Sequence, residues 1–207
     1  MAVTNTLGAS GIEQPSETSL NTSSPLDIPA QGVSVVFSPP TLVTAELLVV
    51  SPNIQLSIVP LLIIPILLSC LFVLSLRLMR KVSSIELVSR RERLVPSLFA
   101  SASGAALLAA LYATGSNSEV RMLAAAVTVQ LVILTAVTIF WKISYHAATA
   151  GTLLLSVMFV GSPQFVLPVA ALALAVCWAR VHLRRHTPAQ VAMGMASALP
   201  LVLLVAG

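Results

Sequence analysis

Apolar residues occur in this chain as long runs separated by short polar segments. A transmembrane helix needs about 20 apolar residues to cross a hydrocarbon core of ~30 Å. Runs near this length predict seven candidate spans, over residues 33–50, 56–79, 94–114, 120–141, 145–161, 164–179 and 188–206. Backbone groups in lipid must find hydrogen-bond partners within their own segment, so we expect these spans to be helices.

The first of these runs is the weakest, because it contains Pro39, Pro40 and Glu46. If it is re-entrant, six spans remain. The pattern therefore predicts an all-α, polytopic bundle of six or seven transmembrane helices. An acid inside a span is often functional, but next to prolines near a span end an interfacial or structural role for Glu46 is favoured.

Residues 1–32 differ from the rest of the chain. They are rich in Ser, Thr, Pro, Asn and Gly, contain three acidic residues, and have no Lys or Arg. No basic segment precedes an apolar core, so the block does not resemble a signal peptide. We expect a disordered tail over residues 1–32 and a transmembrane helical domain over residues 33–207.

The composition supports the membrane interpretation. Hydrophobic residues make up 57% of the chain and charged residues 9%, and the mean hydropathy is +0.97. Soluble domains carry about 25% charged residues, so an integral, multi-pass membrane protein is expected. Aromatic residues are only 5% and the basic residues adjoin apolar spans, which argues against a nucleic acid partner. The two cysteines are isolated from each other and predict neither a disulfide framework nor a zinc site.

The basic residues are distributed asymmetrically about the predicted spans. Ten of the eleven Lys and Arg residues fall on the side that the chain reaches after its second span, and only Arg121 falls on the other. The positive-inside rule predicts that this basic side faces the cytoplasm. The ten are Arg77, Arg80, Lys81, Arg90, Arg91, Arg93, Lys142, Arg180, Arg184 and Arg185.

Two of the three histidines stand near predicted helix starts on the basic side. Ser144 is a candidate N-cap two residues before His146, and Thr187 followed by a proline is a start signal directly after His186. Helix N-termini attract anions, and Lys142 and Arg180 end the preceding spans. This combination predicts an anion site, and phosphate suits it best because Arg can bind phosphate through two hydrogen bonds.

The spacing resembles that of the type 2 phosphatidic acid phosphatase superfamily, the lipid phosphate phosphatases. The family's third motif is Ser-Arg, five residues, His, three residues, Asp. Arg180 and His186 match it in register, while Ala179 replaces Ser and Gln190 replaces Asp.

The family's second motif, Pro-Ser-Gly-His, is matched at Ser144 and His146, with Ile143 and Tyr145 in the other two places. The first motif, Lys, six residues, Arg-Pro, is not matched, and Arg90 to Arg93 is only a loose substitute. The Lys-Ile-Ser-x-His and His-Thr-Pro-Ala-Gln-Val stretches look like a divergent bacterial branch, which implies a bacterial plasma membrane. The resemblance covers residues 85–207 and implies a lipid-phosphatase-like helical core.

The resemblance implies a role for each matched residue. His186 would attack phosphorus to form a phosphohistidine, His146 would protonate the leaving group, and Gln190 would orient His186. The substrate would be a lipid phosphate or diphosphate, such as phosphatidate or a polyprenyl phosphate, and neither a metal nor another cofactor is expected. The implied phosphate-binding residues are Arg180, Ser144, Lys142, Arg93 and Arg90.

Two other functions stay open at this stage. A catalytically degenerate relative could bind phospholipid head groups or serve as a structural subunit of a membrane complex, which the missing Asp and the poor first motif favour. A small transporter is the third possibility, but the spans show no obvious inverted repeat and few polar residues.

Overall fold

The computed structural model describes residues 24–50, 58–87, 89–159 and 161–206. Within these ranges the chain forms helices and connecting loops, and no strand. The helices are α1 (Asp27–Val36), α2 (Pro39–Val50), α3 (Val59–Leu78), α4 (Arg90–Ala113), α5 (Ser118–Phe140), α6 (Tyr145–Phe159), the short 3-10 helix η1 (Pro163–Phe165), α7 (Val166–His182), α8 (Pro188–Ala196) and α9 (Leu199–Ala206). The predicted all-α class is confirmed for these residues.

In the part of the chain that the structure describes, four helical segments are long and apolar enough to cross a membrane. They are α3, α4, α5 and the continuous segment Pro163–His182 that joins η1 to α7. Two further apolar segments, Tyr145–Phe159 and Pro188–Leu203, are shorter. The prediction of a membrane protein is thus supported, whereas six or seven spans are not confirmed.

The predicted first span, residues 33–50, is wrong as one continuous helix. The chain leaves the helical conformation at Phe37 (φ −97°, ψ 49°), and a new helix begins at Pro39. Proline disfavours a helical residue before it and lacks the N–H that would continue a helix. The predicted tail is also too long, because its residues 27–32 belong to α1; its residues 1–23 lie outside the described part of the chain.

The predicted last span is interrupted for a similar reason. α8 ends at Ala196 and α9 begins at Leu199. Pro200 cannot donate to the carbonyl of Ala196, four residues earlier, and its ring would clash with that carbonyl. The break leaves two short helices where the hydropathy pattern predicted one span.

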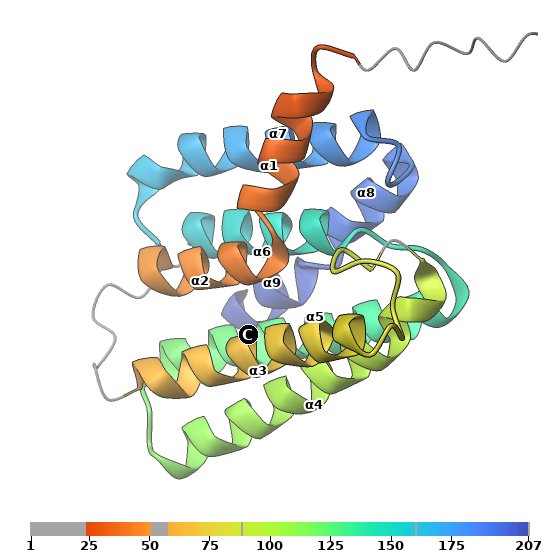
Figure 1. The fold of residues 1–207 in the computed structure, drawn as a ribbon. Helices are drawn as coiled ribbons and strands as arrows, with labels where there is room; N and C mark the ends of the chain where they lie inside the picture. The colour runs from red at the N-terminus through yellow and green to blue at the C-terminus, as the bar shows by residue number, and fades with distance from the viewer. Residues whose placement is uncertain (1–23, 51–57, 88, 160, 207) are drawn as a thin grey trace, which may run out of the picture.

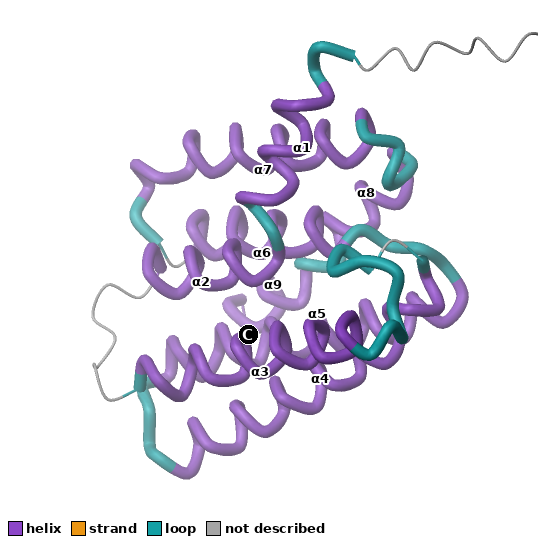
Figure 2. The backbone as a smooth tube through the Cα atoms, in the orientation of Figure 1, coloured by secondary structure: helices purple, strands orange, loops and turns teal. Residues whose placement is uncertain are grey.

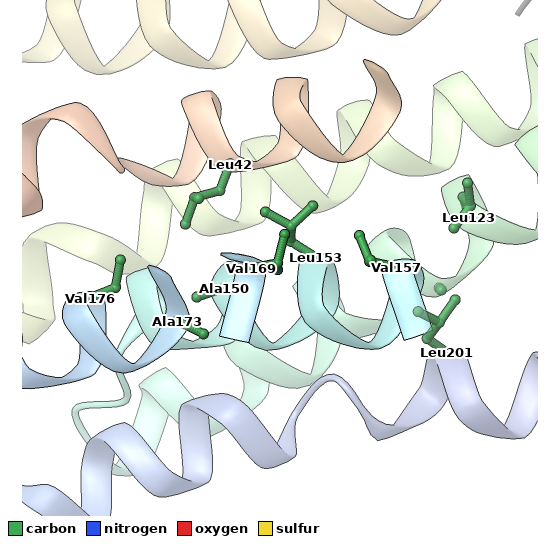
Figure 3. Packing of buried hydrophobic residues seen from close by; sticks show 10 residues of the cluster. Leu42, Leu123, Ala150, Leu153, Val157, Val169, Ala173, Val176 and Leu201 are labelled. Atoms are coloured by element: carbon green, nitrogen blue, oxygen red, sulfur yellow. The ribbon is translucent and has the colours of Figure 1, made fainter. Parts of the chain in front are cut away.

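The helices pack as a bundle in which α6 is central (Figure 1). α6 contacts α2, α7, α8 and α9, while α4 packs between α3 and α5. The largest apolar core surrounds α6 and includes Leu42, Leu153, Val157, Val176 and Leu201 (Figure 3). This core also buries Glu46 on α2, which is 2% exposed and accepts a 2.5 Å hydrogen bond from Ser156 on α6. Glu46 therefore links α2 to α6 inside the protein, which is consistent with the structural role expected of it.

Three connections meet at one end of the bundle. The α3–α4, α5–α6 and α7–α8 loops lie together there (Figure 2). They contain or adjoin the basic residues that the sequence placed on one side of the membrane. The fold thus brings the two predicted helix starts, at Tyr145 and Pro188, to the same end.

Candidate functional site

The loop before α6 presents His146 on the first helical turn. Ser144 is fully buried, and its Oγ accepts a hydrogen bond of 3.4 Å from the backbone N–H of Ala147. This is an N-cap contact, so the predicted cap is confirmed. The Ser144 hydroxyl, which was expected to bind phosphate, thus already accepts a hydrogen bond from the start of α6.

The end of α7 carries Arg180 and turns the chain toward His186. The Arg184 N–H donates to the Val181 carbonyl (2.9 Å) and the Arg185 N–H to the Arg180 carbonyl (3.1 Å), which is a Schellman turn. Arg184 has the left-handed conformation that this turn requires (φ 52°). The same Arg180 carbonyl also accepts from the backbone N–H of His186 (3.2 Å).

A capping box begins α8 directly after His186. Thr187 Oγ1 accepts from the Gln190 backbone N–H (3.3 Å), and Gln190 Oε1 accepts from the Thr187 backbone N–H (3.2 Å). Because a backbone N–H can only donate, this contact fixes which end of the Gln190 amide points toward Thr187. The predicted Thr187 cap and the proline after it are confirmed.

Gln190 in turn fixes the tautomer of His186. Its Oε1 lies 3.1 Å from His186 Nδ1, which agrees with the expectation that Gln190 orients His186. An amide oxygen accepts, so Nδ1 must donate and Nε2 of the neutral ring carries the lone pair. His186 is 6% exposed, and its Nε2 is buried with no hydrogen-bond partner among the described residues.

Burial and neighbouring cations keep this imidazole neutral. Burial, followed by the positive charges of Arg93, Arg180 and Lys142, lowers the pKa of His186 from its ordinary value to about 3. Burial and the nearby arginines also lower the pKa of Lys142. His186 therefore offers an unprotonated, solvent-shielded nitrogen within a strongly positive field near neutral pH.

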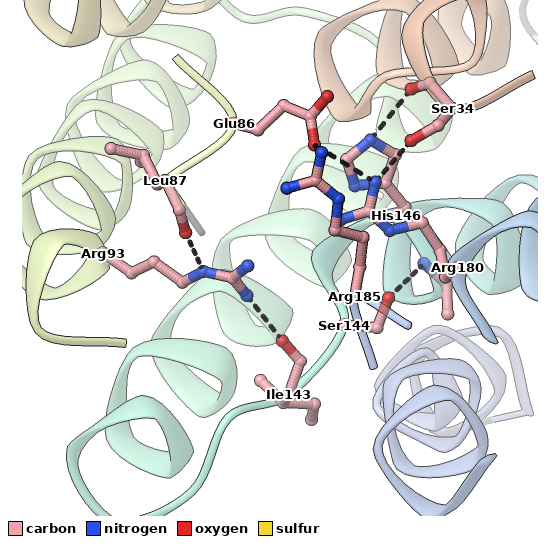
Figure 4. A network of polar contacts seen from close by, with 10 residues as sticks. Ser34, Glu86, Leu87, Arg93, Ile143, Ser144, His146, Arg180 and Arg185 are labelled. Atoms are coloured by element: carbon pink, nitrogen blue, oxygen red, sulfur yellow. Dashed lines mark hydrogen bonds and ion pairs between the residues drawn. The ribbon is translucent and has the colours of Figure 1, made fainter. Parts of the chain in front are cut away.

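Arg180 supplies the central charge of this field (Figure 4). It is 1% exposed, and its Nη1 donates to the hydroxyl of Ser34 and lies 3.7 Å from the Glu86 carboxylate. Glu86 also lies 3.8 Å from Arg185 Nη2. Arg180 Nε is buried without a hydrogen-bond partner in the described part of the chain. The site thus contains an unused donor on Arg180 as well as the unused lone pair of His186.

His146 points at the same residue of α1 as Arg180 does (Figure 4). Its Nε2 lies 3.1 Å from the Ser34 carbonyl oxygen, so Nε2 must be a donor. His146 is 8% exposed. His146 and Arg180 therefore share Ser34 as a partner in one buried cluster. His186 lies in the turn after α7, within the electrostatic influence of Arg180.

The two arginines predicted at the start of α4 have different surroundings. Arg93 is buried, donates to the Leu87 carbonyl (2.6 Å) and the Ile143 carbonyl (2.9 Å), and ties α4 to the loop before α6. Arg90 donates to the Ile139 carbonyl (2.5 Å) at the end of α5. Arg93 thus adjoins the histidine cluster, whereas Arg90 stabilises a helix end.

Two members of this cluster, Ser34 and Glu86, were not predicted from the sequence. Ser34 gave no signal, because it lies in a run that was interpreted as a lipid-spanning helix. Glu86 had a weak signal, since it is the one acid in a loop whose other charged residues, Arg80 and Lys81, are basic. Only the packing of α1 and of the α3–α4 loop brings these two residues to Arg180.

This arrangement can bind an anion through the buried guanidinium of Arg180, and it places a nucleophilic nitrogen, His186 Nε2, in the same positive field. No group of three or more His, Cys, Asp or Glu side chains that could hold a metal ion occurs in the ranges that the structure describes. Comparisons of the chain with protein-family models, with curated proteins and with solved structures found no match.

Proposed function

We propose that this protein is a membrane phosphatase that hydrolyses a lipid phosphate or diphosphate through a phosphohistidine intermediate. The observation that carries the proposal is that His186 and Arg180 are both buried, and that each has a buried polar atom without a partner among the described residues. A nucleophilic nitrogen and a guanidinium N–H are the two groups that phosphoryl transfer to histidine requires.

The first chemical step forms a nitrogen–phosphorus bond. The Nε2 lone pair of His186 attacks phosphorus while the bond from phosphorus to the lipid oxygen breaks. Arg180, with Arg93 and Lys142 nearby, stabilises the charge on the phosphoryl oxygens. The leaving lipid oxygen takes a proton from the imidazolium form of His146, which leaves that ring neutral. The Nδ1 proton of His186 stays on Nδ1 and donates to the Gln190 carbonyl.

The second step reverses the proton transfer. A water molecule attacks the phosphohistidine, and His146 takes up a proton from that water. The nitrogen–phosphorus bond breaks and returns its electron pair to His186 Nε2. The products are inorganic phosphate and a lipid alcohol, or a lipid monophosphate where the substrate is a diphosphate.

The cellular setting belongs to the same proposal. We expect a multi-pass protein of a bacterial plasma membrane with a lipid-phosphatase-like core, in which the shorter segments Tyr145–Phe159 and Pro188–Leu203 add to the four longer ones. The apolar tail of the substrate would stay in the bilayer, and its head group would enter at the loop end of the bundle, which we expect to be cytoplasmic.

Phosphate release from phosphatidate and from a polyprenyl diphosphate tests the proposal. We expect release by the purified protein, none by His186→Asn, and a loss of at least about a hundredfold in Arg180→Gln. Arg121→Gln, at the other end of the bundle, is the charge-matched control and should keep full activity. An acid-labile phosphoryl group trapped on the wild type but not on His186→Asn would identify the intermediate.

One observation favours a second candidate function, in which the protein binds lipid head groups without hydrolysis. The residue that orients His186 is a neutral amide, which cannot stabilise an imidazolium as a carboxylate would. Lipid binding without phosphate release by any variant would support this structural or lipid-binding role and would end the catalytic proposal.

A further inference from the structure

The C-terminal end of α1 lies where an anion would bind. Ser34 is 3% exposed and is in the last turn of the helix. Its carbonyl oxygen is 3.1 Å from His146 Nε2, and its hydroxyl accepts from Arg180 Nη1. Ser34 thus accepts a hydrogen bond from His146 and another from Arg180. The proposed function assigns both of these residues to phosphate chemistry.

The electrostatics of a helix end explain this preference. The last four carbonyls of an α-helix lack partners within the helix and carry a partial negative charge. The preceding carbonyl, that of Val33, is capped by the Phe37 N–H (3.0 Å), whereas that of Ser34 projects to His146. The end of α1 therefore resembles a weak anion in a site with a net positive field.

α1 is short and packs chiefly on one other helix, although its Val33 also packs against the core around α6. It has only ten residues, which is shorter than a helix that is stable in isolation. Among the described elements it packs chiefly on α7, and its far end is fixed by Asp27 Oδ1, 3.0 Å from His182 Nε2. A short segment of this kind can separate from the bundle locally while the rest stays folded.

We propose that α1 is an intramolecular competitor of the phosphate group, with Ser34 as the residue that the phosphate replaces. The inference rests on the proposed function for the identity of the ligand. A phosphoryl group carries more negative charge than a helix end and can accept two hydrogen bonds from the Arg180 guanidinium. Substrate binding then requires α1 to leave its position, and the apparent affinity for phosphate is reduced by the fraction of protein in which α1 is docked.

Orthovanadate affinity of the full chain tests the competition, because vanadate mimics the phosphoryl group and needs no turnover. Asp27→Ala and His182→Ala break the same contact from opposite sides and should each tighten vanadate binding roughly fivefold. Val35→Ala, on the exposed face of α1, is the matched control and should leave the affinity unchanged. In the wild type, vanadate should also accelerate hydrogen exchange of the α1 amides.

The outcomes separate this inference from the proposed enzyme activity. Equal vanadate affinity in all four proteins, or α1 amides that vanadate leaves equally protected, would overturn the competitor role even if lipid phosphate is hydrolysed. Tighter vanadate binding by both Asp27→Ala and His182→Ala, without phosphate release by any protein, would support the competitor role and contradict the phosphatase. Failure of every variant to bind vanadate would overturn both.

Discussion

Gln190 shows how one side chain can serve both folding and chemistry. Its Oε1 accepts from the Thr187 backbone N–H and from His186 Nδ1, so the atom that starts α8 also selects the tautomer of the proposed nucleophile. A neutral amide performs the first task as well as a carboxylate would. It performs the second less well, because attack by His186 places a positive charge on the ring.

Gln190→Glu is therefore expected to raise phosphate release by at least about tenfold. Glutamate has the same length, so it can keep both hydrogen bonds, and its charge is also favourable at a helix N-terminus. Gln190→Met, of similar size but without an acceptor, should lower the rate below wild type. A Gln190→Glu rate at or below that of the wild type would show that the amide is not the limiting group.

The pH dependence of stability reports on the same histidine. The pKa of His186 is about 3 in the folded protein, because of burial and of the charges of Arg93, Arg180 and Lys142, whereas an exposed histidine has a pKa near 6.5. Below that ordinary value the unfolded chain binds a proton that the folded protein does not. His186 therefore makes its full contribution to stability above about pH 6.5 and loses it as the pH falls toward 3.

Thermal unfolding at pH 7 and pH 5 measures this effect. We expect the wild type to lose more stability between these values than His186→Asn, which has no group to protonate. In the wild type, the imidazole NMR signals of His186 should still show a neutral ring at pH 5. Identical pH sensitivity in the two proteins would contradict the lowered pKa.

At the scale of helices, two short turns determine where the site residues lie. The Schellman turn after α7 spans Arg180 to Arg185, and the capping box then starts α8. The turn uses a left-handed arginine (φ 52°) where glycine is usual. Because Arg184 is exposed, the effect of a substitution on stability depends on the backbone conformation at this position and not on side-chain contacts.

Arg184→Gly should be more stable than Arg184→Ala by about 1 kcal/mol, because only glycine adopts the left-handed conformation without steric cost. Both variants lose the same charge, so the comparison isolates the backbone effect. Unfolding of the two proteins in the same detergent measures the difference. An alanine variant as stable as the glycine variant would show that the turn does not retain this conformation.

A second feature at this scale is the close approach of α8 to the loop before α6. Gly194 packs so tightly there that an added Cβ would lie 2.5 Å from the Ser144 carbonyl oxygen. The Ser144 N–H also donates to the Gln190 carbonyl (3.3 Å). The contact therefore holds the two histidine-bearing turns together.

Gly194→Ala should separate these turns, lower stability by about 1–3 kcal/mol and abolish phosphate release. Gly32→Ala is a matched control, because Gly32 lies in α1 with no atom within 4 Å of an added Cβ. That substitution should be neutral or slightly stabilising, as alanine favours the helix. Comparable losses in both variants would contradict a specific role for Gly194.

For the whole molecule, the common end of three loops sets the expected orientation in the membrane. The α3–α4, α5–α6 and α7–α8 connections lie at the basic end (Figure 2), whereas the α4–α5 connection lies at the opposite one. Arg121, near the start of α5, is the only basic residue outside the basic end. The positive-inside rule then predicts that the loop end with the histidine cluster is cytoplasmic.

Labelling of intact cells with a membrane-impermeant maleimide tests this orientation. A cysteine at Ser118, which is exposed at the α4–α5 end, should react from outside, and one at exposed Ser83 should react only after lysis. The protein without an introduced cysteine controls for reaction at Cys70 and Cys177. The reverse pattern would place the site outside the cytoplasm.

The sequence by itself determined the helical class, the four longest apolar helices, both helix caps and the Gln190–His186 contact. These features are local, since hydropathy runs, caps and contacts four residues apart depend on neighbours in the chain. The placement of Arg180, His186 and Gln190 in one turn and the helix start after it could therefore be predicted from the sequence alone.

Only the tertiary structure decided the rest of the cluster. Ser34 reaches Arg180 across 146 residues of sequence and His146 across 112, and no periodicity encodes such contacts. The hydropathy pattern also predicted one span over residues 33–50. It cannot distinguish a helix that packs on the protein from one that faces lipid, because both are apolar. The position of α1 depends on the helices that pack against it. That packing places the C-terminal end of α1 next to His146 and Arg180.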